Sequence, residues 1–150
     1  MDERKPFFAR REPTVGEVRV MVTVTSFGDP TQQIDFEGLV DTGAFGLILP
    51  RTWKERLGPF SHRSEIELET ADQRVVTAEV CAPVWIQIAG FRRIPDEVVF
   101  VDMEPGRRRD YEPLVGYTIL QRSGLVIDMV THRLHPRKYF DLKRLASAAA

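Results

Sequence analysis

Short apolar or alternating segments recur along the chain and are separated by turns that contain Gly, Pro and Asp. Segments of this length that are rich in β-branched residues predict strands rather than helices. The expected strands are residues 18–25, 34–40, 46–49, 65–70, 74–88, 91–101, 125–130 and 133–135. Pro50 can open a short helix over residues 51–57, which Gly58 would close. Many short strands with one or two short helices predict an all-β fold, a small closed barrel-like structure.

Two of these segments carry more detailed information. Residues 34–40 first alternate and then become fully apolar as they approach Asp41, which predicts a strand that passes from a half-exposed edge into the interior. Within the long segment 74–88, Pro83 has no amide donor and predicts a bend or an edge position. Residues 71–73 are turn-like and separate two strands, so residues 65–80 predict a β-hairpin.

Length and charge limit the class of protein. The chain has 150 residues and a formal net charge of −1, which predicts one domain with its own core. A charge near zero gives no whole-chain attraction to nucleic acid or to an anionic membrane, so neither partner is expected. The single cysteine, Cys81, excludes an internal disulfide and fits a small buried core residue. No apolar stretch has the length of a signal peptide or a membrane span, so we expect a cytoplasmic location.

The segment 38–50 carries the chemistry and reads Gly-Leu-Val-Asp-Thr-Gly-Ala-Phe-Gly-Leu-Ile-Leu-Pro. Asp41 lies at the end of an apolar strand, where an ionised carboxylate is costly to bury unless something stabilises it. Thr42 is small and Gly43 has no side chain, so backbone N–H groups can come close to that carboxylate. The plainer alternative is a buried strand-turn-strand in which Asp41 only caps a turn.

The run Asp41-Thr42-Gly43-Ala44, after two apolar residues, resembles the active-site loop of aspartic proteases. Residues 113–120, Pro-Leu-Val-Gly-Tyr-Thr-Ile-Leu, match a second pattern of that family, in which two apolar residues and a glycine precede a short helix. Over residues 17–135 the chain resembles the retropepsin-like, single-lobed members. The resemblance implies an acid-protease fold for that domain, with residues 1–16 as an N-terminal arm and residues 136–150 as a C-terminal tail.

The resemblance also implies a reaction. In this family two carboxyl groups share one proton, so that one accepts a proton from water and the other donates a hydrogen bond to the peptide carbonyl. The chain has one Asp-Thr-Gly, and Asp128, its other candidate, is expected to end a strand before a turn. An aspartic endopeptidase built from this chain would therefore be a homodimer with Asp41 from each subunit and no cofactor or metal. The catalytic residues would be Asp41, Thr42, which braces the dimer, and Gly43.

The family closes a hairpin flap over an extended peptide, and the hairpin 65–80 lies at the matching distance after the motif. The substrate would contact the tip of this hairpin, the end of the Asp41 loop and the second motif. Residues 114–116 of that second motif would also pack behind the Asp41 loop and support its position. The predicted substrate-binding residues are Ala44, Phe45, Ala71, Asp72, Gln73, Val115 and Gly116.

Two positions depart from the family pattern. At the position of Phe45, viral relatives usually carry an acidic residue and many other relatives carry Ser. At the position of Tyr117, relatives often carry Arg or Asp. We expect these two rings to pack together in place of an ion pair. Phe45 also keeps open a second interpretation, a non-catalytic dimeric or peptide-binding module that retains the fold. A third is a monomer whose motif is purely structural.

Overall fold

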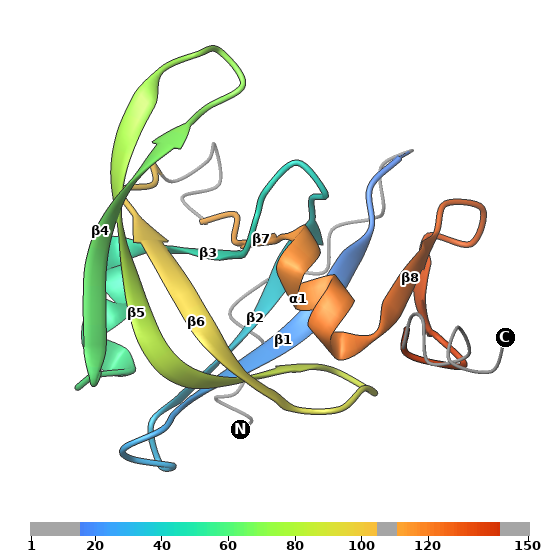
Figure 1. Ribbon diagram of the computed structural model, residues 1–150, viewed down its shortest axis with the longest axis horizontal. Helices are drawn as coiled ribbons and strands as arrows, with labels where there is room; N and C mark the ends of the chain where they lie inside the picture. The colour runs from blue at the N-terminus through green and yellow to red at the C-terminus, as the bar shows by residue number, and fades with distance from the viewer. Residues whose placement is uncertain (1–15, 105–110, 142–150) are drawn as a thin grey trace, which may run out of the picture.

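The computed structural model describes residues 16–104 and 111–141 (Figure 1). Residues 1–15 of the predicted arm and 142–150 of the predicted tail lie outside the described residues. The strands are β1 Arg19–Ser26, β2 Gln33–Val40, β3 Leu47–Pro50, β4 His62–Glu69, β5 Val75–Ile88, β6 Ile94–Val101, β7 Leu114–Val115, β8 Leu125–Asp128 and β9 Arg133–Pro136. The helices are the 3-10 helix η1 Arg51–Arg56 and the α-helix α1 Tyr117–Ser123.

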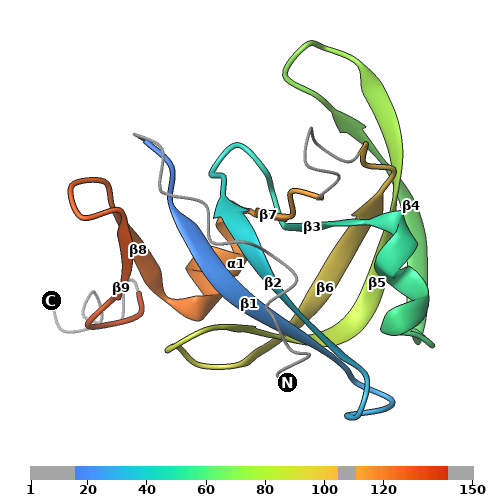
Figure 2. The same cartoon turned by 180° about the vertical axis from the view of Figure 1, so that it is seen from behind.

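Seven strands form one sheet in the order β1-β2-β7-β3-β6-β5-β4, and β1 also pairs with β5. This additional pairing closes six of the strands into a ring and leaves β4 as an edge strand beside it. β8 and β9 form a separate antiparallel hairpin that lies next to α1 in both views (Figures 1 and 2). The prediction of an all-β, barrel-like fold with a few short helices is therefore confirmed. None of the helices in the described ranges is long and apolar enough to cross a membrane.

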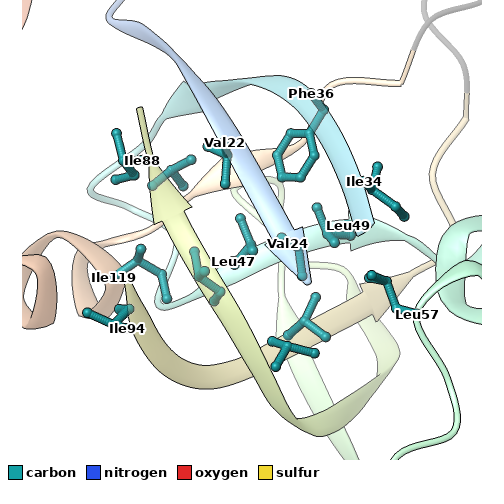
Figure 3. Packing of buried hydrophobic residues seen from close by; sticks show 14 of the residues in the cluster. Val22, Val24, Ile34, Phe36, Leu47, Leu49, Leu57, Ile88, Ile94 and Ile119 are labelled. Atoms are coloured by element: carbon teal, nitrogen blue, oxygen red, sulfur yellow. The ribbon is translucent and has the colours of Figure 1, made fainter. Parts of the chain in front are cut away.

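The interior of the ring is filled by aliphatic and aromatic side chains from every side of the barrel (Figure 3). Burying one side chain of this size contributes about 1.5–3 kcal/mol to folding. Alternation along β1 and β2 brings inward Val22, Val24, Ile34 and Phe36. A second, smaller cluster supports the cleft described below and consists of Ile48, Ala78, Val80, Val99 and Val101.

The long strand β5 contains an irregularity where the sequence predicts one. Its register against β6 shifts between Cys81 and Val84, so the prediction of a bend at Pro83 is confirmed. Cys81 is fully buried, and desolvation raises the pKa of its thiol to about 11. The predicted role of Cys81 as a small core residue is confirmed, because it belongs to the main buried cluster. A neutral buried thiol is also a poor nucleophile.

Candidate active site

Asp41 is the first residue after β2, at the point where the chain turns toward β3. The amide of Asp41 donates to the carbonyl of Val115 at 3.0 Å, so β7 fixes its backbone. The amide of Gly43 donates to Oδ1 of Asp41 at 2.8 Å, and that of Ala44 donates to the Asp41 carbonyl at 3.1 Å. These contacts close a tight loop around the carboxylate and leave it half-buried.

The start of α1 holds the other half of this loop. Gly116 and Tyr117 donate their amides to the carbonyls of Gly46 and Ala44, each at 2.9 Å. Thr118 contacts the Phe45 carbonyl twice, through its amide at 3.1 Å and its hydroxyl at 2.5 Å. The first amides of a helix have no partner within the helix, and here the loop supplies carbonyl partners for them. The Asp41 loop is thus fixed by β7 and α1, which lie about 75 residues further along the chain.

A cleft of about 700 Å³ opens beside Asp41, between this loop, the β4–β5 hairpin and the end of β6. Its lining is mainly apolar, and the ionisable residues among the described lining are Asp41 and Glu69. The lining residues are Asp41, Gly43, Ala44, Phe45, Ile48, Leu68, Glu69, Thr70, Ala71, Val76, Val101, Met103 and Leu114. An apolar groove of this size beside a carboxylate can hold the side chains of an extended peptide.

The β4–β5 hairpin forms one wall of the cleft and rises past the β2–β3 loop (Figure 1). Its turn is closed by the Thr70 amide, which donates to the Arg74 carbonyl at 2.8 Å. Thr70 and Arg74 also donate side-chain hydrogen bonds to Asp72, and the hydroxyl of Thr70 is the main reason that the pKa of Asp72 is lowered. The carboxylate of Asp72 is therefore engaged in the turn itself.

The structure brings five of the ten predicted site residues to the cleft: Asp41, Gly43, Ala44, Phe45 and Ala71. Thr42, Asp72 and Gln73 are exposed and do not line it. Val115 and Gly116 are buried behind the Asp41 loop. Sequence reasoning missed the apolar residues that β3, β4, β5, β6 and β7 contribute. One signal was available, since the alternation in residues 65–70 places Leu68 on the inward side of its strand.

The predicted packing of Phe45 against Tyr117 is wrong within one chain. Aromatic ring contacts among residues 16–104 and 111–141 do not include this pair. Phe45 packs instead against the second apolar cluster, while Tyr117 is 43% exposed. Tyr117 is the first residue of α1, where its backbone contacts the loop and its side chain is left on the surface.

Asp128 ends a strand before a turn, as expected for it, and its side chain caps that turn. It is the last residue of β8, and Oδ1 accepts hydrogen bonds from the amides of Val130 and Thr131 at 2.8 and 3.2 Å. The Thr131 amide, followed by that of Val130, lowers the pKa of Asp128 to about 2. Its Oδ2 lies 3.2 Å from Nε2 of His135. These contacts commit Asp128 to the β8–β9 turn.

A closed barrel that presents an aspartate loop beneath a β-hairpin defines an acid-protease-like protein. The sequence model of the aspartyl protease family matches residues 20–119, two thirds of the chain, and the chain therefore belongs to the aspartyl protease family. A search among curated proteins found no match.

A solved structure agrees with this family at the level of the fold. The chain is similar to EIAV protease complexed with the inhibitor HBY-793, with 20% identity, a TM-score of 0.51, and coverage of 71% of this chain and 86% of that chain. A retropepsin-like aspartic protease from Rickettsia conorii matches with 19% identity and a TM-score of 0.39, over 81% of this chain and 91% of that one. The predicted resemblance to retropepsin-like proteins is confirmed.

Proposed function

We propose that this protein is an aspartic endopeptidase that hydrolyses peptide bonds as a homodimer, with one Asp41 from each subunit. The observation that carries the proposal is the position of Asp41, in a loop fixed by β7 and α1 at the edge of an apolar cleft beneath a hairpin. Cleavage by a water molecule needs one carboxylate to accept a proton and one carboxylic acid to donate a hydrogen bond.

The reaction follows from two Asp41 side chains that share one proton. The ionised carboxylate accepts a proton from water as the water oxygen bonds to the peptide carbonyl carbon. The protonated carboxyl donates its proton to the carbonyl oxygen, which gives a neutral tetrahedral diol. Proton transfer to the peptide nitrogen then allows the C–N bond to break, and one diol hydroxyl returns its proton to the pair. Two carboxyls in contact cannot easily both ionise, so they titrate as a pair.

The need for a second subunit follows from the composition of the cleft. Besides Asp41, its described ionisable lining contains only Glu69, which ends β4 in the hairpin and is not part of the loop. The second loop carboxylate must come from another copy of the chain. A two-fold axis beside Asp41 places the same loop of each subunit face to face.

The β8–β9 hairpin offers a surface for this association. Its exposed apolar residues include Val126, Met129 and Val130, and Val130 is 91% exposed. In Figures 1 and 2 the turn of this hairpin, the β2–β3 loop and the β4–β5 hairpin all point toward the same side of the molecule. A second copy that met this side would cover the apolar turn and bring the two Asp41 loops together.

Replacing Val130 by Asp is expected to weaken the dimer at least about tenfold, because the new carboxylate would be desolvated in the interface. Specific activity should fall in parallel and recover at higher protein concentration. Analytical ultracentrifugation and peptide cleavage measured over the same concentration series would show both effects. Ala89→Asp is the matched control, since Ala89 is exposed in the β5–β6 turn, outside the β8–β9 hairpin. A Val130→Asp dimer as tight as wild type would exclude this surface.

The concentration dependence of wild-type activity tests the proposal itself. With an unstructured protein as substrate between about pH 4 and 7, a range suited to a carboxyl pair, specific activity should fall as dilution dissociates the dimer. Constant specific activity across the dissociation range would contradict a shared active site.

A non-catalytic peptide-binding dimer is the second candidate, and Phe45 favours it. Its ring lines the cleft and packs on the second apolar cluster, where many relatives carry a polar side chain. A stable dimer that binds an unstructured substrate without cleaving it would support this candidate over the enzyme.

A further inference from the structure

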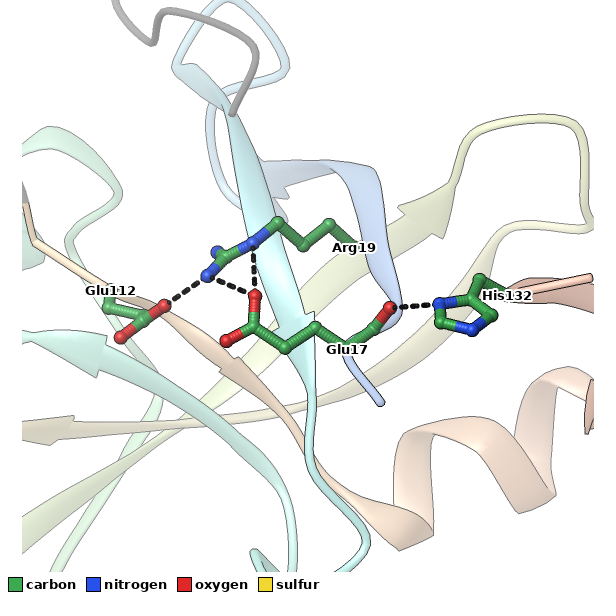
Figure 4. Close-up of polar contacts among 4 residues, drawn as sticks. All are labelled: Glu17, Arg19, Glu112 and His132. Carbon is green, nitrogen blue, oxygen red and sulfur yellow. Dashed lines mark hydrogen bonds and ion pairs between the residues drawn. The ribbon is translucent and has the colours of Figure 1, made fainter. Parts of the chain in front are cut away.

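A half-buried guanidinium group links β1 to the segment that precedes β7 (Figure 4). The side chain of Arg19 is 12% exposed. Its Nη2 donates to Oε1 of Glu112 at 2.6 Å and to Oε2 of Glu17 at 3.1 Å. Its Nε donates to the same Glu17 oxygen at 3.3 Å. Charge-assisted hydrogen bonds of this kind are about twice as strong as neutral ones, although the exposed parts of Glu17 and Glu112 leave them partly screened by solvent.

Glu112 lies two residues before β7, directly ahead of the backbone that pairs with β2. The carbonyl of Pro113 accepts the Leu39 amide at 2.9 Å, and the carbonyl of Val115 accepts the Asp41 amide at 3.0 Å. β7 itself contains two residues, so its own ladder gives it little rigidity. It pairs with β2 and β3, and the contacts of the residues just before it add to what holds its position relative to Asp41.

Side-chain contacts of Tyr111 and Glu112 help to hold that preceding segment. Arg19 binds Glu112, and the ring of Tyr111 packs edge-on against Trp53, with centroids 6.2 Å apart and planes at 85°. The Tyr111 contact fixes the segment to η1, whereas the Glu112 contact fixes it to β1. Arg19 lies opposite Leu39, which in turn lies opposite Leu114, so Arg19 lies at the level of the barrel where β2 pairs with β7.

We infer that Arg19 is a positioning residue for the hydrolysis proposed above, acting through Glu112 and β7 on the backbone of Asp41. Shared-proton chemistry needs the two carboxyls within about 0.5 Å of their productive positions, so a small shift of β7 would lower the chemical rate. Arg19 and Glu112 do not line the cleft, so substrate binding would be little affected. The inference rests on the proposed function, but its structural part can be measured without activity.

The kinetic test compares Arg19→Met, Arg19→Lys and Glu112→Gln with wild type at concentrations that keep the dimer intact. We expect Arg19→Met to lower kcat about tenfold or more with KM within about twofold, the pattern of an interaction that acts in the transition state. Arg19→Lys should recover part of the rate, because it keeps the charge but loses the two-pronged geometry. The control is Arg137→Met, which removes the ion pair of Arg137 with Asp141 at 2.9 Å and should leave kcat unchanged.

The second readout is amide hydrogen exchange of the folded proteins. Exchange at Leu39 and Asp41 should be at least about tenfold faster in Arg19→Met and Glu112→Gln than in wild type and Arg137→Met, because their acceptors are on the released segment. If wild type cleaves no peptide, the proposed function is wrong. Amide hydrogen exchange at Leu39 and Asp41 would still show whether Arg19 holds the backbone of this segment. If Arg19→Met does not fold, Glu112→Gln decides both readouts. Unchanged kcat and unchanged exchange in a folded variant would overturn the inference.

Discussion

Replacing Asp41 by Asn is expected to abolish peptide hydrolysis while the dimer stays folded. Asn has nearly the same shape, and its side-chain oxygen can still accept the Gly43 amide that Oδ1 accepts at 2.8 Å. An amide cannot accept a proton from water or donate one to the peptide nitrogen. Because both subunits of a homodimer carry the substitution, acid and base are lost together. The rate should fall on the order of 10⁴-fold or more.

Cleavage of an unstructured protein by wild type and Asp41→Asn, with the dimer followed by light scattering, measures this effect. Asp35→Asn is a suitable control, because Asp35 is an exposed carboxylate on β2, the strand that leads to Asp41, and accepts a hydrogen bond from the Thr23 hydroxyl at 2.5 Å. It should retain wild-type activity. Equal cleavage by wild type and Asp41→Asn would refute the catalytic role of Asp41. No cleavage by either protein, with a dimer present, would favour the peptide-binding module.

Local sequence patterns predicted most of the fold because each strand has its own signature. The change from alternating to apolar residues before Asp41 predicted a strand that enters the interior, and β2 does so in part: its exposed and buried residues alternate and then give way to the half-buried Leu39 and Val40. Pro83 marked the irregularity in β5, since it cannot donate to the ladder. These features depend on residues adjacent in the chain, so one sequence is sufficient to find them.

The remaining features depend on strand pairing, which no local pattern specifies. Val101 and Met103 reach the cleft because β6 pairs in parallel with β3 beneath the Asp41 loop. Arg19 and Glu112 are 93 positions apart and meet because β2 lies between β1 and β7. The pairing of Phe45 with Tyr117 was inferred from a family ion pair. It failed because Phe45 has an apolar cluster on its own side of the loop.

Replacing Gly116 by Ala is expected to displace the Asp41 loop or unfold the barrel, although the backbone conformation at this position suits any residue. A Cβ atom on Gly116 would lie 2.4 Å from the carbonyl oxygen of Ala44, and 2.5 and 2.6 Å from the oxygen and nitrogen of Gly46. All three are backbone atoms, which cannot rotate away as a side chain could. Overpacking against fixed atoms should cost about 3 kcal/mol or more and lower Tm by roughly 10 °C.

Thermal unfolding and peptide cleavage should respond together, because Gly116 donates to the Gly46 carbonyl within the loop that positions Asp41. Gly28→Ala is the matched control: a Cβ there would meet no atom within 4 Å, so Tm should change little. A milder outcome is a folded Gly116→Ala protein with a lower Tm and no cleavage. It would mean that the Asp41 loop is displaced while the barrel stays folded. A Gly116→Ala protein that melts and cleaves like wild type would show that the loop is not packed against α1 as described. The support given by β7 and α1 to Asp41 would then need another explanation.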